Sequence, residues 1–185
     1  TQSRSSAASD VYKRQTPLII ILGPTGAGRA DVVKELVAHA WPEGRKVRVL
    51  REVREGGVAP DAWEFKDGHA IVPAPGDEDA AILVTHGALH VIDQMEALHR
   101  TVRPMQPDAV WRVARILTVV DCPLTMKHKA VEEWYRPCVH FSDAVIINRR
   151  WEVPGQWVSK FLEPYEKEFY PVSYTHLRAH ETKAN

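Results

Sequence analysis

The chain contains little cysteine, no excess of either charge and no long apolar run. Its two cysteines, Cys122 and Cys138, are too few among 185 residues for a disulfide framework, so we expect buried free thiols. The 24 basic and 24 acidic residues give a formal net charge of zero, which provides no attraction to nucleic acid or to an anionic membrane. No apolar run approaches the ~20 residues that a membrane span needs, and no signal-peptide pattern is present. These absences favour a cytoplasmic protein that binds neither nucleic acid nor membranes.

The two ends of the chain differ in composition from its interior. Residues 1–15 (TQSRSSAASDVYKRQ) and 172–185 (VSYTHLRAHETKAN) are polar and have neither helical nor strand periodicity. Both resemble peptides that arise when sequencing-adapter DNA is translated; the alternative is a genuine pair of disordered tails. In either case we assign no function to His176, Arg178 or His180. We expect one domain over residues 16–171, from which a C-terminal part of the gene could be missing.

Four apolar runs predict central strands that are buried on both faces, the pattern of a parallel sheet. They are Pro17–Leu22, Ala80–Thr85, Arg115–Val120 and Ala144–Ile147. A further strand is expected at Lys46–Val53, and Trp63–Val72 predicts a hairpin that turns at Asp67-Gly68.

Segments of helical periodicity lie between these strands. The first helix is expected to pack through Val33, Leu36, Val37 and Ala40, and the helix Val91–Val102 through Ile92, Met95, Leu98 and Val102. Another helix is expected through Met126–Trp134, and a last one from Pro154 to about Tyr170, which Pro164 should kink or split. Alternating strands and helices predict an α/β fold with a mostly parallel central sheet flanked by helices.

The first apolar run leads into a glycine-rich loop and then into the first helix. The loop, Gly23–Ala30, reads Gly-Pro-Thr-Gly-Ala-Gly-Arg-Ala, and its spacing from Gly23 to Gly28 is that of a phosphate-binding P-loop. In this context backbone N–H groups and a helix N-terminus face an anion. The residues expected to bind phosphate are Gly23, Thr25, Gly26, Ala27, Gly28, Arg29 and Ala30. The alternative is a tight strand-to-helix turn with no ligand.

Polar groups follow the later strands at the edge where ligands bind in such sheets. They are Thr85-His86-Gly87, Asp121-Cys122-Pro123 and Asn148–Trp151. In this order, with Val119-Val-Asp121 and Ser142-Asp-Ala-Val-Ile-Ile-Asn148, the series resembles the CobW/HypB/UreG family of metallochaperone-type GTPases, of the SIMIBI class. The resemblance covers Pro17 to about Trp151 and implies a P-loop NTPase-like fold that binds GTP or another nucleoside triphosphate.

The chain departs from the family pattern at each motif. Arg29 replaces the P-loop lysine, and Ala30 replaces the hydroxyl residue that would bind Mg²⁺. Val84 stands where an acid is expected, and at the base-reading motif Arg149 replaces a lysine and Trp151 an aspartate. The family's Cys-x-Cys-Cys metal element is absent, so metal delivery is not carried over and no metal ligands are assigned.

Taken together, these substitutions favour a nucleotide-binding domain with weak or no hydrolysis and with little support for Mg²⁺. Asn148 and Arg149 join the loop residues as expected nucleotide contacts. Asp121 and Thr85 are the only candidates for a catalytic role, and Trp151 could stack on a base.

Two other classes of function are open. The chain could be a non-catalytic interaction module whose last helix binds a protein partner through aromatic residues spaced four apart, namely Trp157, Phe161, Tyr165 and Phe169; the same spacing also suits core packing. It could instead be an active P-loop kinase or NTPase, which would need Asp121 as its carboxylate.

Three smaller features have simple interpretations. For His86 a partly buried, hydrogen-bonded side chain is favoured over a role at a phosphate. His86 and His90 are too few for a zinc site. The acidic run Asp77–Asp79 is expected to be a solvated loop in preference to a substitute Mg²⁺ ligand.

Overall fold

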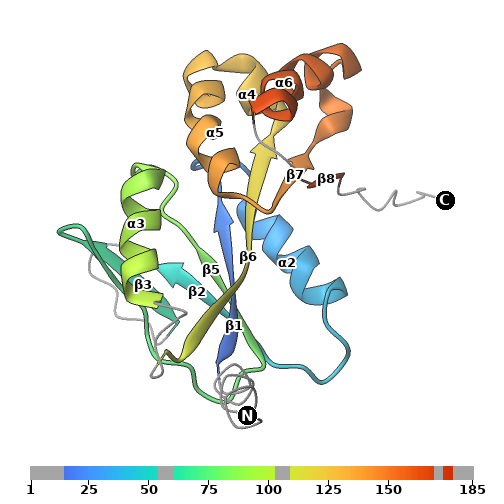
Figure 1. Ribbon diagram of the computed structural model, residues 1–185. Helices are drawn as coiled ribbons and strands as arrows, with labels where there is room; N and C mark the ends of the chain where they lie inside the picture. The colour runs from blue at the N-terminus through green and yellow to red at the C-terminus, as the bar shows by residue number, and fades with distance from the viewer. Residues whose placement is uncertain (1–14, 54–60, 103–108, 169–172, 177–185) are drawn as a thin grey trace, which may run out of the picture.

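A computed structural model describes residues 15–53, 61–102, 109–168 and 173–176 of the chain (Figure 1). Helices and strands alternate as the sequence predicts. The strands are β1 (Thr16–Leu22), β2 (Val47–Glu52), β3 (Ala62–Lys66), β4 (His69–Ile71), β5 (Ala80–Val84), β6 (Trp111–Asp121), β7 (Ala144–Asn148) and β8 (Ser173–His176). The helices are α2 (Arg29–His39), α3 (Val91–Val102), α4 (Cys122–Lys127), α5 (Lys129–Phe141) and α6 (Gly155–Glu168), with a short 3₁₀ turn η1 (Arg150–Glu152).

The strands form one sheet in the order β4-β3-β2-β5-β1-β6-β7-β8. Every neighbouring pair is parallel except β3–β4, which is antiparallel. On β1, Ile20 lies opposite Leu83 of β5 and Ile116 of β6. The carboxyl ends of the central strands therefore meet at one edge, and in Figure 1 β1 and β6 point toward the end of the molecule at which α4 and α6 lie. The predicted α/β fold with a mostly parallel sheet is confirmed.

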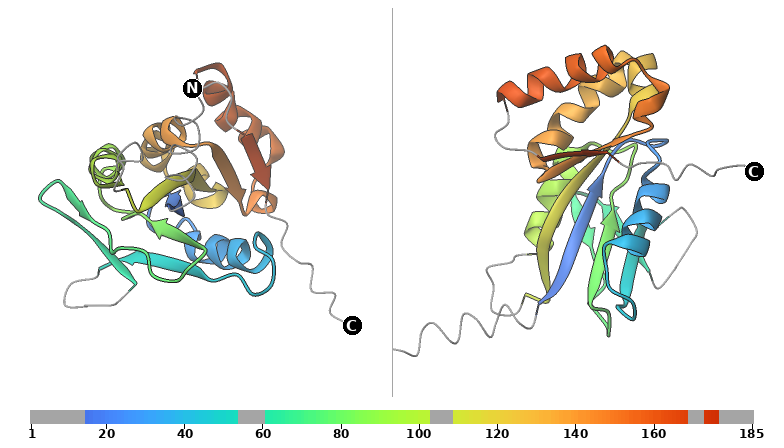
Figure 2. Two further views of the ribbon diagram at one scale, coloured as in Figure 1. Left: turned by 60° about the horizontal axis from the view of Figure 1, so that its bottom comes forward. Right: turned by 90° about the vertical axis from the view of Figure 1, so that its right-hand side faces the viewer.

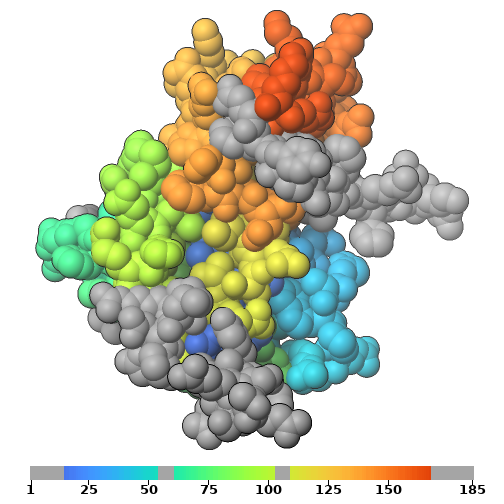
Figure 3. All heavy atoms as spheres, in the orientation of Figure 1, coloured from blue at the N-terminus to red at the C-terminus, as the bar shows by residue number. Residues whose placement is uncertain are grey.

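Helices cover both faces of the sheet. Figure 2 shows α2 on one side and α3 on the other, and Figure 3 shows α3 and α5 side by side over the second face. Under α2 the core contains Ile21, Val33 and Ile82, which are 2% exposed or less. Under α3, α5 and α6 it contains Leu18, Leu98, Tyr135 and other residues. Such two-sided burial is the reason that the central strands read as unbroken apolar runs.

The hairpin turns where the sequence predicts. Asp67 and Gly68 lie between β3 and β4, with φ angles of 50° and 73°. Two successive positive φ values give the turn the twist that suits antiparallel strands.

On α2 and α3 the inward-facing residues differ in part from the prediction. On α2 the buried residues are Val32 and Val33 with Leu36 partly buried, while Val37 is 36% exposed and Ala40, which caps the helix, is also exposed. The expected packing through Val37 and Ala40 is therefore wrong. On α3, Ile92 is 37% exposed and Gln94 takes an inward position at 0%.

The expected helix through Met126–Trp134 is two helices. His128 is extended, with φ −132° and ψ 103°, and separates α4 from α5. The α4 helix starts early because Asp121 caps it and Pro123 suits its first turn.

The aromatic stripe of α6 packs inward. Phe161 and Tyr165 are 3% and 6% exposed, Trp157 stacks on Phe161 with ring centroids 5.3 Å apart, and Phe161 meets Tyr135 of α5 edge to face. Pro164 lies inside α6, which continues to Glu168. Phe169 and Tyr170 lie outside the described residues. Core packing therefore accounts for Phe161 and Tyr165 and for part of Trp157, and the hypothesis of a protein partner on this helix stays a prediction.

Both cysteines are buried free thiols, as predicted. Burial raises the pKa of Cys122 to about 12 and also raises that of Cys138, so neither is a reactive thiolate at neutral pH. No helix in the described ranges is long and apolar enough to cross a membrane. At the C-terminus, Ser173–His176 add β8 in parallel beside β7. The assignment of residues 172–185 to a tail stays a prediction.

Candidate functional site

The loop between β1 and α2 has the backbone of an anion cradle. Gly23, Gly26 and Gly28 have φ angles of 146°, 85° and 74°, values that residues with a side chain rarely adopt. Within the described ranges, the N–H groups of Gly26, Gly28, Arg29 and Ala30 donate to no protein acceptor. Four unpaired donors at the start of an 11-residue helix are what a phosphate group requires.

Neighbouring loops hold this cradle from two sides. The carbonyl of Gly87, after β5, accepts from Thr25 N–H at 3.0 Å. The amide of Asn148, at the end of β7, donates to the Ala27 carbonyl at 3.2 Å. Both approaches depend on glycine, because a Cβ at position 87 would lie 2.4 Å from Thr25 N and a Cβ on Gly28 2.5 Å from Asn148 Nδ2. The sequence-predicted residues Gly23–Ala30 and Asn148 are thus brought together.

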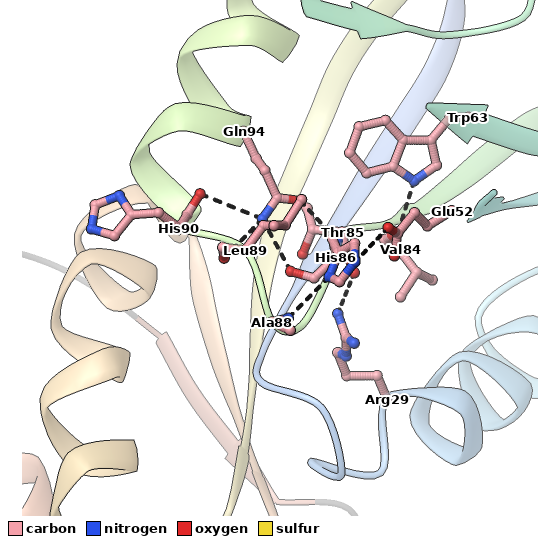
Figure 4. A network of polar contacts seen from close by, with 10 residues as sticks. All are labelled: Arg29, Glu52, Trp63, Val84, Thr85, His86, Ala88, Leu89, His90 and Gln94. Atoms are coloured by element: carbon pink, nitrogen blue, oxygen red, sulfur yellow. Dashed lines mark hydrogen bonds and ion pairs between the residues drawn. The ribbon is translucent and has the colours of Figure 1, made fainter. Parts of the chain in front are cut away.

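Arg29 points across the cradle toward the end of β5 (Figure 4). Its Nη1 donates to the Thr85 carbonyl at 2.5 Å, and Gly87 lies against its Nη2. Among the described residues no carboxylate forms an ion pair with it. Burial lowers the pKa of Arg29, and the charge of Arg51 lowers it further. A half-buried cation with only one hydrogen bond from five donors leaves room for an anion.

A buried glutamine holds the loop that follows β5. Gln94 of α3 is 0% exposed; its Oε1 accepts from His86 N–H at 2.8 Å, and its Nε2 donates to the carbonyls of His86 at 3.0 Å and Leu89 at 3.1 Å (Figure 4). The loop that touches the cradle therefore rests on a side chain that sequence reasoning missed. The sequence did offer one signal: Gln94 is a polar residue on the same helix face as Val91 and Leu98, and a buried polar side chain needs hydrogen-bond partners.

His86 is partly buried and hydrogen-bonded, as predicted. Its Nδ1 accepts from Ala88 N–H at 3.0 Å, and its Nε2 lies 2.7 Å from Glu52 Oε1. These partners fit the neutral tautomer with the proton on Nε2. Burial and the charge of Arg29 lower the pKa of His86. Because both ring nitrogens are engaged, His86 offers no free base to the cradle.

Asp121 is committed to structure at the end of β6. Its Oδ1 accepts from Leu124 N–H at 2.9 Å, which caps α4. Arg149 binds both carboxylate oxygens at 2.6 Å, and this pair raises the pKa of Arg149. Arg149 has a left-handed backbone, with φ 53°. The expected nucleotide contact Arg149 therefore holds a carboxylate, and the catalytic candidate Asp121 is 0% exposed beneath it.

The protein oxygens near the cradle offer little to Mg²⁺, which in nucleotide sites takes one or two protein ligands besides water and phosphate oxygens. Ala30 has none, the Thr85 hydroxyl donates to the Ile21 carbonyl at 3.1 Å, and the carboxylates of Asp121 and Glu52 are engaged. Thr25 is exposed and would be the nearest free hydroxyl of the loop. No group of three or more metal-binding side chains occurs among the described residues.

The acidic run Asp77–Asp79 cannot supply the missing ligand. It precedes β5, and Ala81 of β5 pairs with Leu18 near the start of β1, so the run lies at the edge opposite the cradle. There Asp77 pairs with Lys46 and Asp79 with Arg45. The solvated-loop interpretation holds for Asp77 and Asp79 but is wrong for Glu78, whose side chain is 7% exposed and lies 3.6 Å from Arg48.

The remaining site predictions have separate positions. Trp151 is 59% exposed in η1, and Val84, where the family pattern has an acid, is 8% exposed with its carbonyl accepting from Trp63 Nε1 at 2.9 Å. His90 lies 3.9 Å from Asp93 and belongs to no group of three or more metal-binding side chains in the described ranges.

A mostly parallel sheet with helices on both faces, and a glycine loop joining its central strand to a helix, are features of a P-loop NTPase-like α/β fold. Among solved structures, the chain is similar to the hydrogenase maturation factor HypB from Archaeoglobus fulgidus. The TM-score is 0.52 at 11% identity, over 93% of this chain and 85% of that one. A Zn(II)-bound YjiA GTPase from E. coli matches with a TM-score of 0.45 at 10% identity, over 92% of this chain and 59% of that one. No protein-family model matches the sequence, and no curated protein does so either.

Proposed function

We propose that the chain is a nucleotide-binding P-loop module for GTP or another nucleoside triphosphate, and that it hydrolyses its ligand weakly or not at all. The observation that carries this proposal is Arg29. Among the described residues its half-buried guanidinium has no carboxylate partner, and it lies beside four N–H groups of the cradle that are unpaired there. Leaving such a charge uncompensated is costly, and a phosphate chain would satisfy both the charge and the donors.

Weak hydrolysis follows from the groups around the cradle. A hydrolase needs a metal or an equivalent charge on the phosphates and a residue that orients the attacking water. Ala30 offers no metal ligand, Val84 is apolar, and Asp121 is bound on both oxygens by Arg149. No described side chain with a free basic atom faces the phosphate position from β5, because both nitrogens of His86 are engaged.

Base selectivity should also be low. The side-chain amide of Asn148 donates to the Ala27 carbonyl, and Arg149 is held by Asp121, so both side chains are already engaged. Position 151 carries an exposed tryptophan in place of a carboxylate acceptor, and an aromatic ring stacks on any base. Guanine and adenine nucleotides are therefore expected to bind with similar affinity.

Calorimetric titration of the full chain with GTP, ATP, GDP and ADP tests the proposal. We expect both triphosphates to bind, and Arg29→Ala to weaken them about tenfold or more, since a charge-assisted contact is lost. Arg45→Ala is the matched control, because Arg45 is an exposed arginine at the opposite edge of the sheet. Absence of binding by the wild-type chain at millimolar nucleotide would refute the proposal.

A phosphate-release assay addresses turnover separately. The wild-type chain with saturating GTP or ATP should release phosphate near the rate of buffer alone. Turnover within the usual enzyme range of about 1 per second or faster would favour the kinase or NTPase alternative and would refute the loss of hydrolysis. A cytoplasmic location is also part of the proposal, because both cysteines are buried free thiols.

A further inference from the structure

We propose that Arg51, together with Arg29, supplies the positive charge that Mg²⁺ provides in other P-loop sites, so that this site takes a nucleoside triphosphate free of metal. The inference rests on the proposed function and identifies the form of the ligand. It starts from the oxygen atoms described above: among the described residues around the cradle, the exposed Thr25 hydroxyl is free, and the others that could bind a metal are missing or engaged. A triphosphate bound without a metal needs its charge neutralised by the protein.

The position of Arg51 follows from the alternation of β2. Side chains of a strand point to opposite faces in turn. Val47 and Val49 pack with the core under α2, whereas Leu50 lies in the core of the other face. Arg51 therefore belongs to the face that α2 covers. It stands one residue beyond the pair Leu50–Leu83, at the carboxyl edge where the cradle lies.

Both arginines lie on the α2 side of the sheet at its carboxyl edge. The charge of Arg51 lowers the pKa of Arg29, which is the effect of a like charge nearby. Arg51 is exposed, so it can reach a ligand at the mouth of the site without first leaving a buried partner.

Neither cation is compensated within the described part of the chain. Glu52, the nearest carboxylate in sequence, pairs with His86 at 2.7 Å, and Asp61 pairs with Arg48 at 2.8 Å. No ion pair there involves Arg29 or Arg51. Two like charges held together destabilise the ligand-free site, and an anion between them removes that repulsion. Their summed charge equals that of the absent divalent cation.

Calorimetry with ATP, GTP and inorganic tripolyphosphate, each in EDTA and in Mg²⁺, tests the inference on the full chain. We expect wild-type affinity in EDTA to match or exceed that in Mg²⁺. Arg51→Ala should weaken all three ligands about tenfold or more in EDTA, and Arg51→Lys should recover most of the loss. Arg115→Ala, an exposed arginine on β6, should bind as the wild type does. Unfolding midpoints of the variants verify that each is folded.

A second variant introduces the missing metal ligand. Arg29→Lys combined with Ala30→Thr should make affinity rise when Mg²⁺ is added, because the new hydroxyl and the narrower ammonium leave space for the ion. Unchanged titrations of this double variant would count against the mechanism.

The two proposals fail differently. Wild-type binding that requires Mg²⁺, or that is unaffected by Arg51→Ala, would overturn the metal-free inference while the nucleotide-binding proposal stands. Absence of wild-type binding in both buffers would overturn both.

Discussion

Replacing Gln94 by leucine should destabilise the protein because it removes the support of the loop after β5. Leucine has a similar volume, so no large cavity forms, but three hydrogen bonds of 2.8, 3.0 and 3.1 Å are lost. Each is worth about 1 kcal/mol net when its backbone partner is left unpaired, which gives a loss of about 3 kcal/mol in the free energy of unfolding. A typical domain has a total of about 5–15 kcal/mol, so the variant should be folded but much weakened.

Urea unfolding measures this loss. With an m value of about 2 kcal/mol/M, the midpoint should fall by roughly 1.5 M at unchanged m. Glu96→Leu is the control, because Glu96 lies on the same helix in an exposed ion pair with Arg100 and should change stability by less than about 0.5 kcal/mol. The amide of His86, which donates to Gln94, should also lose hydrogen-exchange protection. A midpoint within error of the wild type, with that amide still protected, would refute the role given to Gln94.

Three further results are expected. Gly28→Ala should lower the free energy of unfolding more than Gly68→Ala does, although the two φ angles are 74° and 73°. Both substitutions strain a left-handed residue by about 1 kcal/mol, but only the first displaces Asn148. Equal urea midpoints would contradict this. Since the pKa of His86 is lowered from its usual 6.5, the unfolded chain binds more protons just below pH 6.5, so stability falls on acidification there; His86→Gln should flatten that slope, and an identical slope would exclude the effect. Trp63→Phe should lower the free energy of unfolding by about 2 kcal/mol, because losing the fully buried indole N–H leaves the Val84 carbonyl of β5 unpaired. An unchanged midpoint in thermal or urea unfolding would show that this bond is unimportant.

Much of the fold follows from the period and length of the apolar runs. Pro17–Leu22 and Ala144–Ile147 predict β1 and β7 almost to the residue, since strands buried on both faces leave no polar position to confuse the pattern. The rotation of α2 was harder to predict. Val32, Val33, Leu36 and Val37 are all apolar, so their spacing alone does not decide which of them face the sheet; the connection from Gly28 does so.

The residues of the cradle could be predicted from local spacing, but their partners could not. The Gly23–Ala30 pattern specifies a turn whose backbone is largely determined by neighbours in sequence. The pairing of Arg149 with Asp121 depends on a positive φ at a non-glycine residue, which no local pattern announces. The same holds for Gln94, whose bonds reach from α3 to the loop after β5. Hydrogen bonds between residues so far apart in sequence depend on how the helices pack on the sheet.

The hydrogen bonds by which Gly87 and Asn148 hold the cradle have a consequence for how the loop would receive a ligand. A loop held from both sides is preorganised, so a ligand loses little affinity to the ordering of the backbone that receives it. A part of the affinity for phosphate would then come from main-chain donors, which the substitution of side chains does not remove. Such a loop can keep its shape when the side chains around it change, so that selection for binding and selection for turnover become separable.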